Sequence, residues 1–276
     1  MKIVKHSGDV VDYNPDKLRN SLVKSGANST VVDDILERIE KEIYDGMPTK
    51  QIYKLAFGYL KKASNSHAAR YNLRQALQLL GPAGFFFEKY MARLFEAEKY
   101  ETKTNVTLQG RCVTHELDVV IRKNGLIAMV ECKFHTRREA TTDVKVPMYI
   151  LSRFNDLKEN LHVMFSGREV ISKCWIITNN RFTSDAVTFA TCSGIHLLSW
   201  DYPKELNLRN KIDSHQLYPI TCLTTLSVAE KDKLLILDVL LVKEIINNSQ
   251  CLEKIGLSTN RIHNVLKEAT ALCRFF

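Results

Sequence analysis

The sequence predicts an α/β protein in which a mixed α/β core lies between two helical segments. Apolar residues are spaced as in helices before about residue 80 and again after about residue 206, whereas strand-like runs occupy much of the middle. Asn124-Gly125 lies between two apolar runs, which is a strong signal for a β-hairpin. Gly81-Pro82-Ala83-Gly84 is the clearest break in the chain. We therefore expect domains at residues 1–80, 81–205 and 206–276.

The first segment is predicted to open with a small hairpin, because apolar runs at Ile3-Val4 and Val10-Val11 flank Ser7-Gly8-Asp9. Asn14 before Pro15 is typical of a helix start, with proline at the first helical position. Four helices are expected, at about residues 14–26, 30–44, 49–62 and 66–80.

The middle segment is predicted to have the element order αβββαβ. Its first helix covers about residues 86–100, and strands follow at about 103–108, 115–122 and 126–134. A helix around 143–160 comes next. A strand at 174–178, a helix after Thr183 and a strand at 195–199 then form a right-handed crossover unit. The C-terminal segment is expected to hold one long helix at 227–246 and another at 258–273.

Composition indicates a protein of the cytoplasm with an anionic partner. The chain has a net charge of +8, and it holds no apolar run near the roughly 18–20 residues that span a bilayer. Its start lacks the features of a signal peptide, so we expect no membrane association. The 7 cysteines include no C-x-x-C pair, which argues against a disulfide framework or a zinc ribbon and favours buried thiols.

The predicted hairpin turn fixes which residues face each other. If Asn124 and Gly125 are the two loop residues, counting outward puts Asp118 opposite Glu131, with both side chains on one face of the sheet. Lys133 lies two residues further along, so it points to that same face.

Two facing carboxylates repel, and a bound cation would remove the conflict. Carboxylate oxygens are the ligands that Mg²⁺ prefers, and Mn²⁺ is an alternative; the ion would activate a water for attack on a phosphodiester. Lys133 would orient that water or stabilise the transition state. The alternative is a surface hairpin in which Lys133, opposite Glu116, only neutralises acidic neighbours. A basic loop with His135, Arg137 and Arg138 follows, and it is either a grip for DNA phosphates or a solvated turn.

These residues resemble the PD-(D/E)xK signature as it looks in Mrr-like restriction endonucleases. The matching pieces are His115-Glu116-Leu117-Asp118, Glu131-Cys132-Lys133, and the entry segment from Gly81 to Glu88. The resemblance implies a restriction-endonuclease-like core in which Asp118 and Glu131 bind the metal, Lys133 is catalytic, and Glu88 completes the metal site or orients its water. Cys132 departs from the usual glutamine-type neighbour, and only its backbone carbonyl would approach the metal.

The first segment resembles an ATP-cone, a nucleotide-sensing module. The resemblance rests on Val4-Lys5-His6-Ser7-Gly8, Asp16-Lys17-Leu18 and Ala69-Arg70-Tyr71-Asn72-Leu73-Arg74. It implies that Lys5 and Lys17 contact the triphosphate of ATP or dATP, while Val4 and Ile52 hold the base. His6 stands where many cones have arginine. No GxxxxGK[ST] loop is present, which excludes a P-loop hydrolase. The alternative is a helical domain whose lysines are merely solvated.

Residues 252–262 are typical of a helix, a glycine turn and a second helix, as in some DNA-reading domains. A helical cap on the core or a dimer contact explains the same pattern.

We therefore expect a Mg²⁺-dependent DNA endonuclease of the restriction or defence type, regulated by ATP or dATP. A homodimer is expected if both DNA strands are cut. The alternatives are a nucleotide-responsive DNA-binding regulator that does not cleave, and a structure-specific nuclease of repair or recombination.

Overall fold

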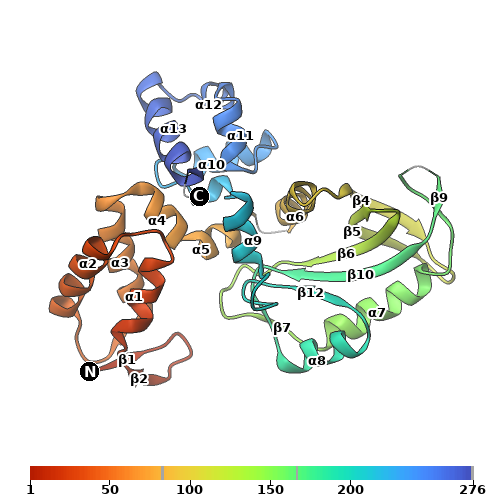
Figure 1. Cartoon of the computed structure of the whole chain (residues 1–276), viewed down its shortest axis with the longest axis horizontal. Helices are drawn as coiled ribbons and strands as arrows, with labels where there is room; N and C mark the ends of the chain where they lie inside the picture. Colours follow the sequence, from red (N-terminus) through yellow and green to blue (C-terminus); the bar gives the residue numbers. More distant parts are fainter. Residues whose placement is uncertain (82–83, 166, 275–276) are drawn as a thin grey trace. The chain divides into compact units, whose positions relative to one another are not determined.

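The computed structural model describes residues 1–81, 84–165 and 167–274 (Figure 1). The chain forms two compact units. One consists of Met1–Leu73 together with Ile220–Phe276, and the other is Arg74–Pro219. The C-terminal helices thus share a unit with the N-terminal segment. Pro82 and Ala83, in the expected boundary stretch, lie outside the described residues.

The N-terminal segment contains the expected hairpin, formed by β1 (Lys2–Val4) and β2 (Val10–Asp12). A third strand that the sequence did not predict, β3 (Met47–Pro48), pairs in parallel with β1. The helices are α1 (Pro15–Val23), α2 (Ser29–Glu42), α3 (Thr49–Ala63), α4 (Asn65–Tyr71) and α5 (Leu73–Gln78). Asn14 caps α1 as predicted, because its side chain accepts hydrogen bonds from the backbone N–H groups of Asp16 and Lys17.

The expectation of one helix at 66–80 was wrong, because α4 ends before Asn72 and α5 begins after it. The Asn72 side chain accepts a hydrogen bond of 2.6 Å from the Tyr53 hydroxyl. Asparagine competes poorly as a helix interior residue because its side chain finds other partners, and here that partner belongs to α3.

The C-terminal helices are α10 (Val228–Ile236), α11 (Val242–Asn247), α12 (Gln250–Lys254) and α13 (Thr259–Cys273), preceded by the 3₁₀ turn η1 (Ile220–Cys222). The expected long helix at 227–246 was wrong. The chain turns at Asp238, whose φ is 60°, and the Glu244 carboxylate accepts the N–H groups of Leu240 and Leu241 to start α11. Helix α13 packs against α4 and α11.

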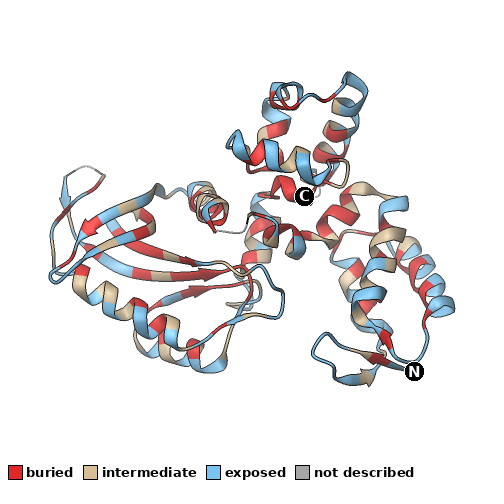
Figure 2. Ribbon diagram, turned by 180° about the vertical axis from the view of Figure 1, so that it is seen from behind, coloured by how far each residue is buried: buried red, intermediate tan, exposed pale blue. Residues whose placement is uncertain are grey.

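The second unit is built on a five-stranded sheet in the order β12-β10-β6-β5-β4. Its strands are β4 (Glu101–Gln109), β5 (Thr114–Lys123), β6 (Leu126–Lys133), β10 (Ile171–Thr178) and β12 (His196–Leu198). Helix α6 (Phe85–Ala97) covers one face, and α7 (Lys145–Leu157) and α8 (Ser184–Cys192) cover the other (Figure 1). This arrangement confirms the predicted αβββαβ order. Buried residues line the strands and the helix sides that face them (Figure 2).

Several short elements of this unit were not predicted. They are β7 (Thr141–Thr142), β8 (His162–Val163), β9 (Arg168–Glu169), β11 (Arg181–Phe182) and α9 (Leu208–His215). Strand β7 pairs with β11, so the loop after β6 is tied to the loop after β10. Within the described parts of the chain, no helix combines the length and the apolar character that crossing a bilayer requires.

The β5–β6 hairpin has the predicted turn and register. Asn124 and Gly125 have φ values of 51° and 75°, both positive as a type I′ turn requires. Lys123 pairs with Leu126, and the ladder continues outward to Val119 opposite Val130.

Candidate active site

Asp118 and Glu131 lie immediately beyond the point where the β5–β6 ladder ends. The last ladder pair is Val119 with Val130, so these two residues are the next ones outward in the same register. The Asp118 carboxylate reaches across the hairpin, and its Oδ2 accepts a hydrogen bond of 2.7 Å from the backbone N–H of Cys132. A side chain of β5 has therefore taken the place of a backbone carbonyl as the acceptor. Cys132 itself is buried, as expected for a residue that points into the core.

Arg153 of α7 completes this end of the hairpin, and sequence reasoning missed it. Its Nη1 lies 2.7 Å from Glu131 Oε2, and its Nη2 donates to the backbone oxygen of Glu116. The ion pair is largely buried, with exposed fractions of 11% for the arginine and 16% for the glutamate side chain. A signal was present: Arg153 shares a helix face with Ile150 and Leu157, both buried, and an arginine on a buried face needs a partner.

Glu88 lies beside the two strand carboxylates. It occupies the first turn of α6, which begins after Gly84 in a left-handed conformation (φ 82°). A side-chain carbon at Gly84 would lie in ordinary van der Waals contact with Glu88 Oε1, at 3.5 Å, so it is the positive φ that favours glycine at this position. Burial raises the pKa of Glu88 to about 7, and the charges of Asp118 and Glu131 add to this effect. The effect of these two charges on Glu88 indicates that α6 brings it close to the strand carboxylates.

The ionised forms of both strand carboxylates are disfavoured at this site. Burial and the charge of Asp118 raise the pKa of Glu131 to about 7, and burial likewise raises the pKa of Asp118. Lys133, the exposed last residue of β6, acts in the opposite direction on both groups. The structure thus brings Glu88, Asp118, Glu131 and Lys133 together.

The donor set fits a hard divalent cation that retains water ligands. Within the described ranges (1–81, 84–165 and 167–274), no group of three or more His, Cys, Asp and Glu side chains is placed so that it could hold a metal ion. Mg²⁺, however, is usually bound through one or two carboxylates, with waters and substrate phosphates supplying the other ligands. Asp118 and Glu131 provide two carboxylates, and crowded anions of this kind are stabilised by a cation.

The basic loop after Lys133 is held from beneath by two buried asparagines. His135 exchanges hydrogen bonds with Asn179, its N–H donating to Oδ1 at 2.9 Å and its carbonyl accepting from Nδ2 at 2.8 Å. Asn180 Nδ2 donates to the carbonyl oxygens of Arg137 at 2.6 Å and Ala140 at 2.9 Å. Both asparagines are 0% exposed. Both were missed by sequence reasoning, although two asparagines directly after an apolar strand are a signal for such a role.

The side chains of this loop differ in their surroundings. His135 is half-buried, with Nε2 2.9 Å from Thr142 Oγ1, and burial lowers its pKa. Arg137 and Arg138 are exposed. Arg74 Nη2 donates to the backbone oxygen of Arg138 at 3.3 Å, which adds a further support to the loop.

The residues expected to bind nucleotide lie at the start of the other unit. Lys5 and His6 follow β1 in an exposed turn, in which the Lys5 N–H donates to the Asp9 oxygen at 2.9 Å. Lys17 is exposed in the first turn of α1, and Val4 is half-buried in β1. Ile52 is packed in the hydrophobic core of this segment at 6% exposure.

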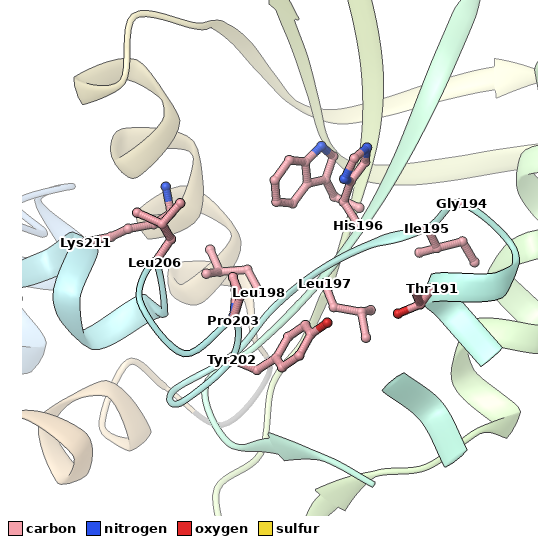
Figure 3. A pocket seen from close by; sticks show the side chains of 11 residues that line it. Thr191, Gly194, Ile195, His196, Leu197, Leu198, Tyr202, Pro203, Leu206 and Lys211 are labelled. Atoms are coloured by element: carbon pink, nitrogen blue, oxygen red, sulfur yellow. The ribbon is translucent and has the colours of Figure 1, made fainter. Parts of the chain in front are cut away.

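A cavity of about 370 Å³ lies elsewhere in the second unit (Figure 3). It is lined by residues of β10, β12 and the segment that follows, among them Trp175 and Tyr202. Trp175 stacks on His196 with ring centroids 4.7 Å apart. None of the predicted site residues lines this cavity, so it is separate from the carboxylate site.

Comparison with known families assigns a domain to each part of the chain. The family described as ATP cone domain matches residues 1–75, and the family described as restriction endonuclease matches residues 82–202. Residues 218–273 match the family described as AF1548-like, C-terminal. The chain therefore combines an ATP-cone with a restriction-endonuclease domain, and both resemblances drawn from the sequence are confirmed.

The chain is also similar to an uncharacterized protein of Archaeoglobus fulgidus, with 36% identity over 180 residues that cover 65% of this chain and 97% of the relative. The crystal structure of a protein of unknown function, AF1548, covers 68% of this chain and 97% of its own, with 34% identity and a TM-score of 0.56. Can2 from Sulfobacillus thermosulfidooxidans, solved with cyclic tetra-adenylate, covers 72% of this chain and 54% of its own at 15% identity and a TM-score of 0.33. The chain belongs to the family of AF1548-like proteins.

Proposed function

We propose that this protein is a divalent-metal-dependent endodeoxyribonuclease of the PD-(D/E)xK type whose activity is regulated by ATP or dATP. The observation that carries the proposal is the position of Asp118 and Glu131 on adjacent strands, just past the last pair of the hairpin ladder. Two further effects support it: the charge of Lys133 acts to lower the pKa of both carboxyls, and the charges of Asp118 and Glu131 raise the pKa of Glu88.

Each residue has a separate part in the proposed chemistry. Asp118 and Glu131 would hold Mg²⁺ or Mn²⁺, and the ion supplies an acidified water and charge neutralisation at the scissile phosphate. Lys133 stabilises the negative charge that develops on that phosphate, because it is a fixed cation at the end of β6. Glu88, whose ionised form is disfavoured, accepts a proton near neutral pH or orients the water.

The loop with His135, Arg137 and Arg138 would contact the DNA backbone. Its two arginines are exposed, while the loop backbone is fixed by Asn179 and Asn180. A fixed loop presents its charges with little loss of conformational entropy on binding, and phosphate contacts position DNA without reading its sequence.

The decisive experiment is a cleavage assay with plasmid, linear and branched DNA, in Mg²⁺ or EDTA, with and without ATP or dATP. We expect the wild type to cleave DNA in Mg²⁺ but not in EDTA, and we expect no cleavage by Asp118→Asn in either. Equal cleavage by the wild type and Asp118→Asn would refute the assignment. Preference for the branched substrate would indicate a repair or recombination nuclease, and efficient cutting of plasmid would favour restriction.

The nucleotide site is proposed at Lys5, His6 and Lys17, with Val4 and Ile52 at the base. The family match to the ATP-cone supports this proposal. Calorimetric titration of ATP into the full-length protein tests it, and Lys5→Ala with Lys17→Ala should abolish the binding heat. Unchanged heat in the double variant would contradict this location.

A homodimer is proposed because one metal site cuts one strand at a time. Sedimentation velocity with and without a DNA duplex measures this directly. A monomer that nevertheless makes double-strand breaks in one binding event would contradict the proposal.

A further inference from the structure

The two strands of the β5–β6 hairpin stop pairing at the candidate site. Their pairing ends at Val119 with Val130, although β5 extends back to Thr114 and β6 continues to Lys133. In this region, side chains form hydrogen bonds with backbone groups of the two strands. Asp118 accepts a hydrogen bond from the Cys132 N–H, and Arg153 donates one to the Glu116 backbone oxygen. The separation is therefore held by specific contacts.

Arg153 connects both separated strands through one planar group. One arm of its guanidinium binds the Glu131 side chain on β6 at 2.7 Å, and the other binds the Glu116 backbone on β5. A guanidinium presents its donors in a rigid fork, so the two contacts fix the Glu131 carboxylate relative to the neighbouring strand.

The helix that carries Arg153 is itself firmly attached to the hairpin. Three residues further along α7, the Asp156 carboxylate accepts hydrogen bonds from the N–H groups of Cys112 and Val113 and is bonded to His115 Nε2. The Asp156 carbonyl accepts from the Arg111 N–H at 2.9 Å. These contacts hold α7 against the start of β5, so the backbone that carries the Arg153 guanidinium has a fixed position.

We propose that Arg153 is a positioning residue that holds Glu131, and the separated strand ends around it, in the arrangement required for divalent-metal binding. This inference rests on the proposed function. Glu131 has one carboxylate oxygen bound to Arg153, which leaves the other for the ion. Without the fork, the side chain gains rotamer freedom and the strands lose the bridge between them.

The magnitude follows from known metal sites, in which removal of a residue that orients a ligand typically weakens metal affinity or activity about 10–100-fold. Lysine keeps the charge but offers a single ammonium point instead of a two-armed fork. We therefore expect Arg153→Lys to bind metal more weakly than the wild type as well.

The test is calorimetric titration of Mn²⁺ into the full-length wild type, Arg153→Ala, Arg153→Lys and a control, Arg122→Ala. Arg122 is a suitable control because it is also a partly buried arginine, with an exposed fraction of 17%, and its partners are the carboxylates of Glu101 and Glu169. It lies four residues along β5 from Asp118, about 13 Å at a rise of about 3.3 Å per residue. Arg153→Ala should bind Mn²⁺ about 10–100-fold more weakly, and Arg122→Ala should bind it like the wild type.

Each outcome decides between the inference and its alternatives. If Arg153→Ala binds Mn²⁺ as tightly as the wild type, or more tightly, Arg153 only neutralises the site and the inference is wrong. If Arg153→Ala does not fold, Arg153→Lys carries the test, and wild-type affinity in that variant overturns the two-armed bridge. A wild type that neither binds Mn²⁺ nor cuts DNA removes the proposed function itself. By contrast, if the wild type binds Mn²⁺ and cuts DNA, and the Arg153 variants bind Mn²⁺ equally well, only the inference about Arg153 is wrong.

Discussion

The Asp118 carboxylate accepts the backbone N–H of Cys132 at 2.7 Å, across the hairpin that Asn124 and Gly125 close. The same side chain is thus both a candidate metal ligand and part of the hydrogen bonding that shapes the strand end. These two tasks respond differently to substitution, which separates catalysis from stability.

Replacing Asp118 tests this dual role. Asp118→Asn keeps an oxygen that accepts from Cys132 but removes the charge, so we expect loss of cleavage with little loss of stability. Asp118→Ala also leaves a half-buried N–H without its acceptor, which costs about 1–3 kcal/mol. Urea denaturation in EDTA measures the difference. Equal stability of the two variants would show that the hydrogen bond is not important for the fold.

The raised pKa of Glu131 predicts a stability that depends on pH. A carboxyl with a raised pKa in the folded state holds a proton that the unfolded chain has already released, so stability falls as pH rises from about 5 through about 7. A divalent cation favours the ionised form and should remove that fall. The lowered pKa of His135 has the opposite effect, because it makes stability rise as pH approaches the usual pKa of histidine from below. A variant is therefore needed to isolate the contribution of Glu131.

That variant is Glu131→Gln, and the measurement is chemical denaturation at pH 5 and pH 8 in EDTA. The wild type should lose more stability between the two values than the variant does. Identical pH profiles would mean that Glu131 is not perturbed in the folded protein.

Replacing Asn180, which supports the basic loop, should lower the stability of the protein. Asn180→Ala leaves the partly buried carbonyls of Arg137 and Ala140 without their donor, a loss of about 1–3 kcal/mol by urea denaturation. Amide hydrogen exchange should rise in residues 135–140. The control is Asn210→Ala, whose exposed side chain also donates to a carbonyl, that of Glu205 at 3.0 Å. Similar losses in both variants would argue against a special role for Asn180.

The exposed arginines of that loop predict a salt effect on DNA binding. Each phosphate contact contributes nearly one unit to the slope of log affinity against log salt, so Arg137→Ala with Arg138→Ala should reduce the slope by about two. Fluorescence anisotropy in EDTA measures binding without cleavage. Arg168→Ala, an exposed arginine of β9, should leave the slope unchanged. An unchanged slope in the double variant would place the DNA contact elsewhere.

The features that could be predicted from the sequence are those set by neighbouring residues. A type I′ turn needs positive φ at two positions, so Asn124-Gly125 was enough to set the register that puts Asp118 and Glu131 on facing strands. The order of helices and strands in the nuclease-like unit followed from the same kind of periodicity.

Contacts between residues far apart in the chain were not predicted from the sequence. Arg153 lies 22 residues from Glu131, and Asn179 lies 44 residues from His135, so no local pattern links them. Asp238 breaks an apolar run that otherwise favours one long helix, and β3 forms only because β1 offers an edge for pairing. These features depend on tertiary structure, which overrides local propensity.

The central claim is that Asp118, Glu131 and Lys133 form one catalytic site. It is tested most directly by the single-turnover rate of cleavage of a labelled DNA in Mg²⁺, comparing the wild type with Lys133→Ala. Lys133 is exposed at the end of β6, so its removal should leave the fold intact. We expect the rate of the variant to be about 100- to 1,000-fold lower, the usual cost of removing one group that stabilises the transition state. Equal rates in the two proteins would contradict it.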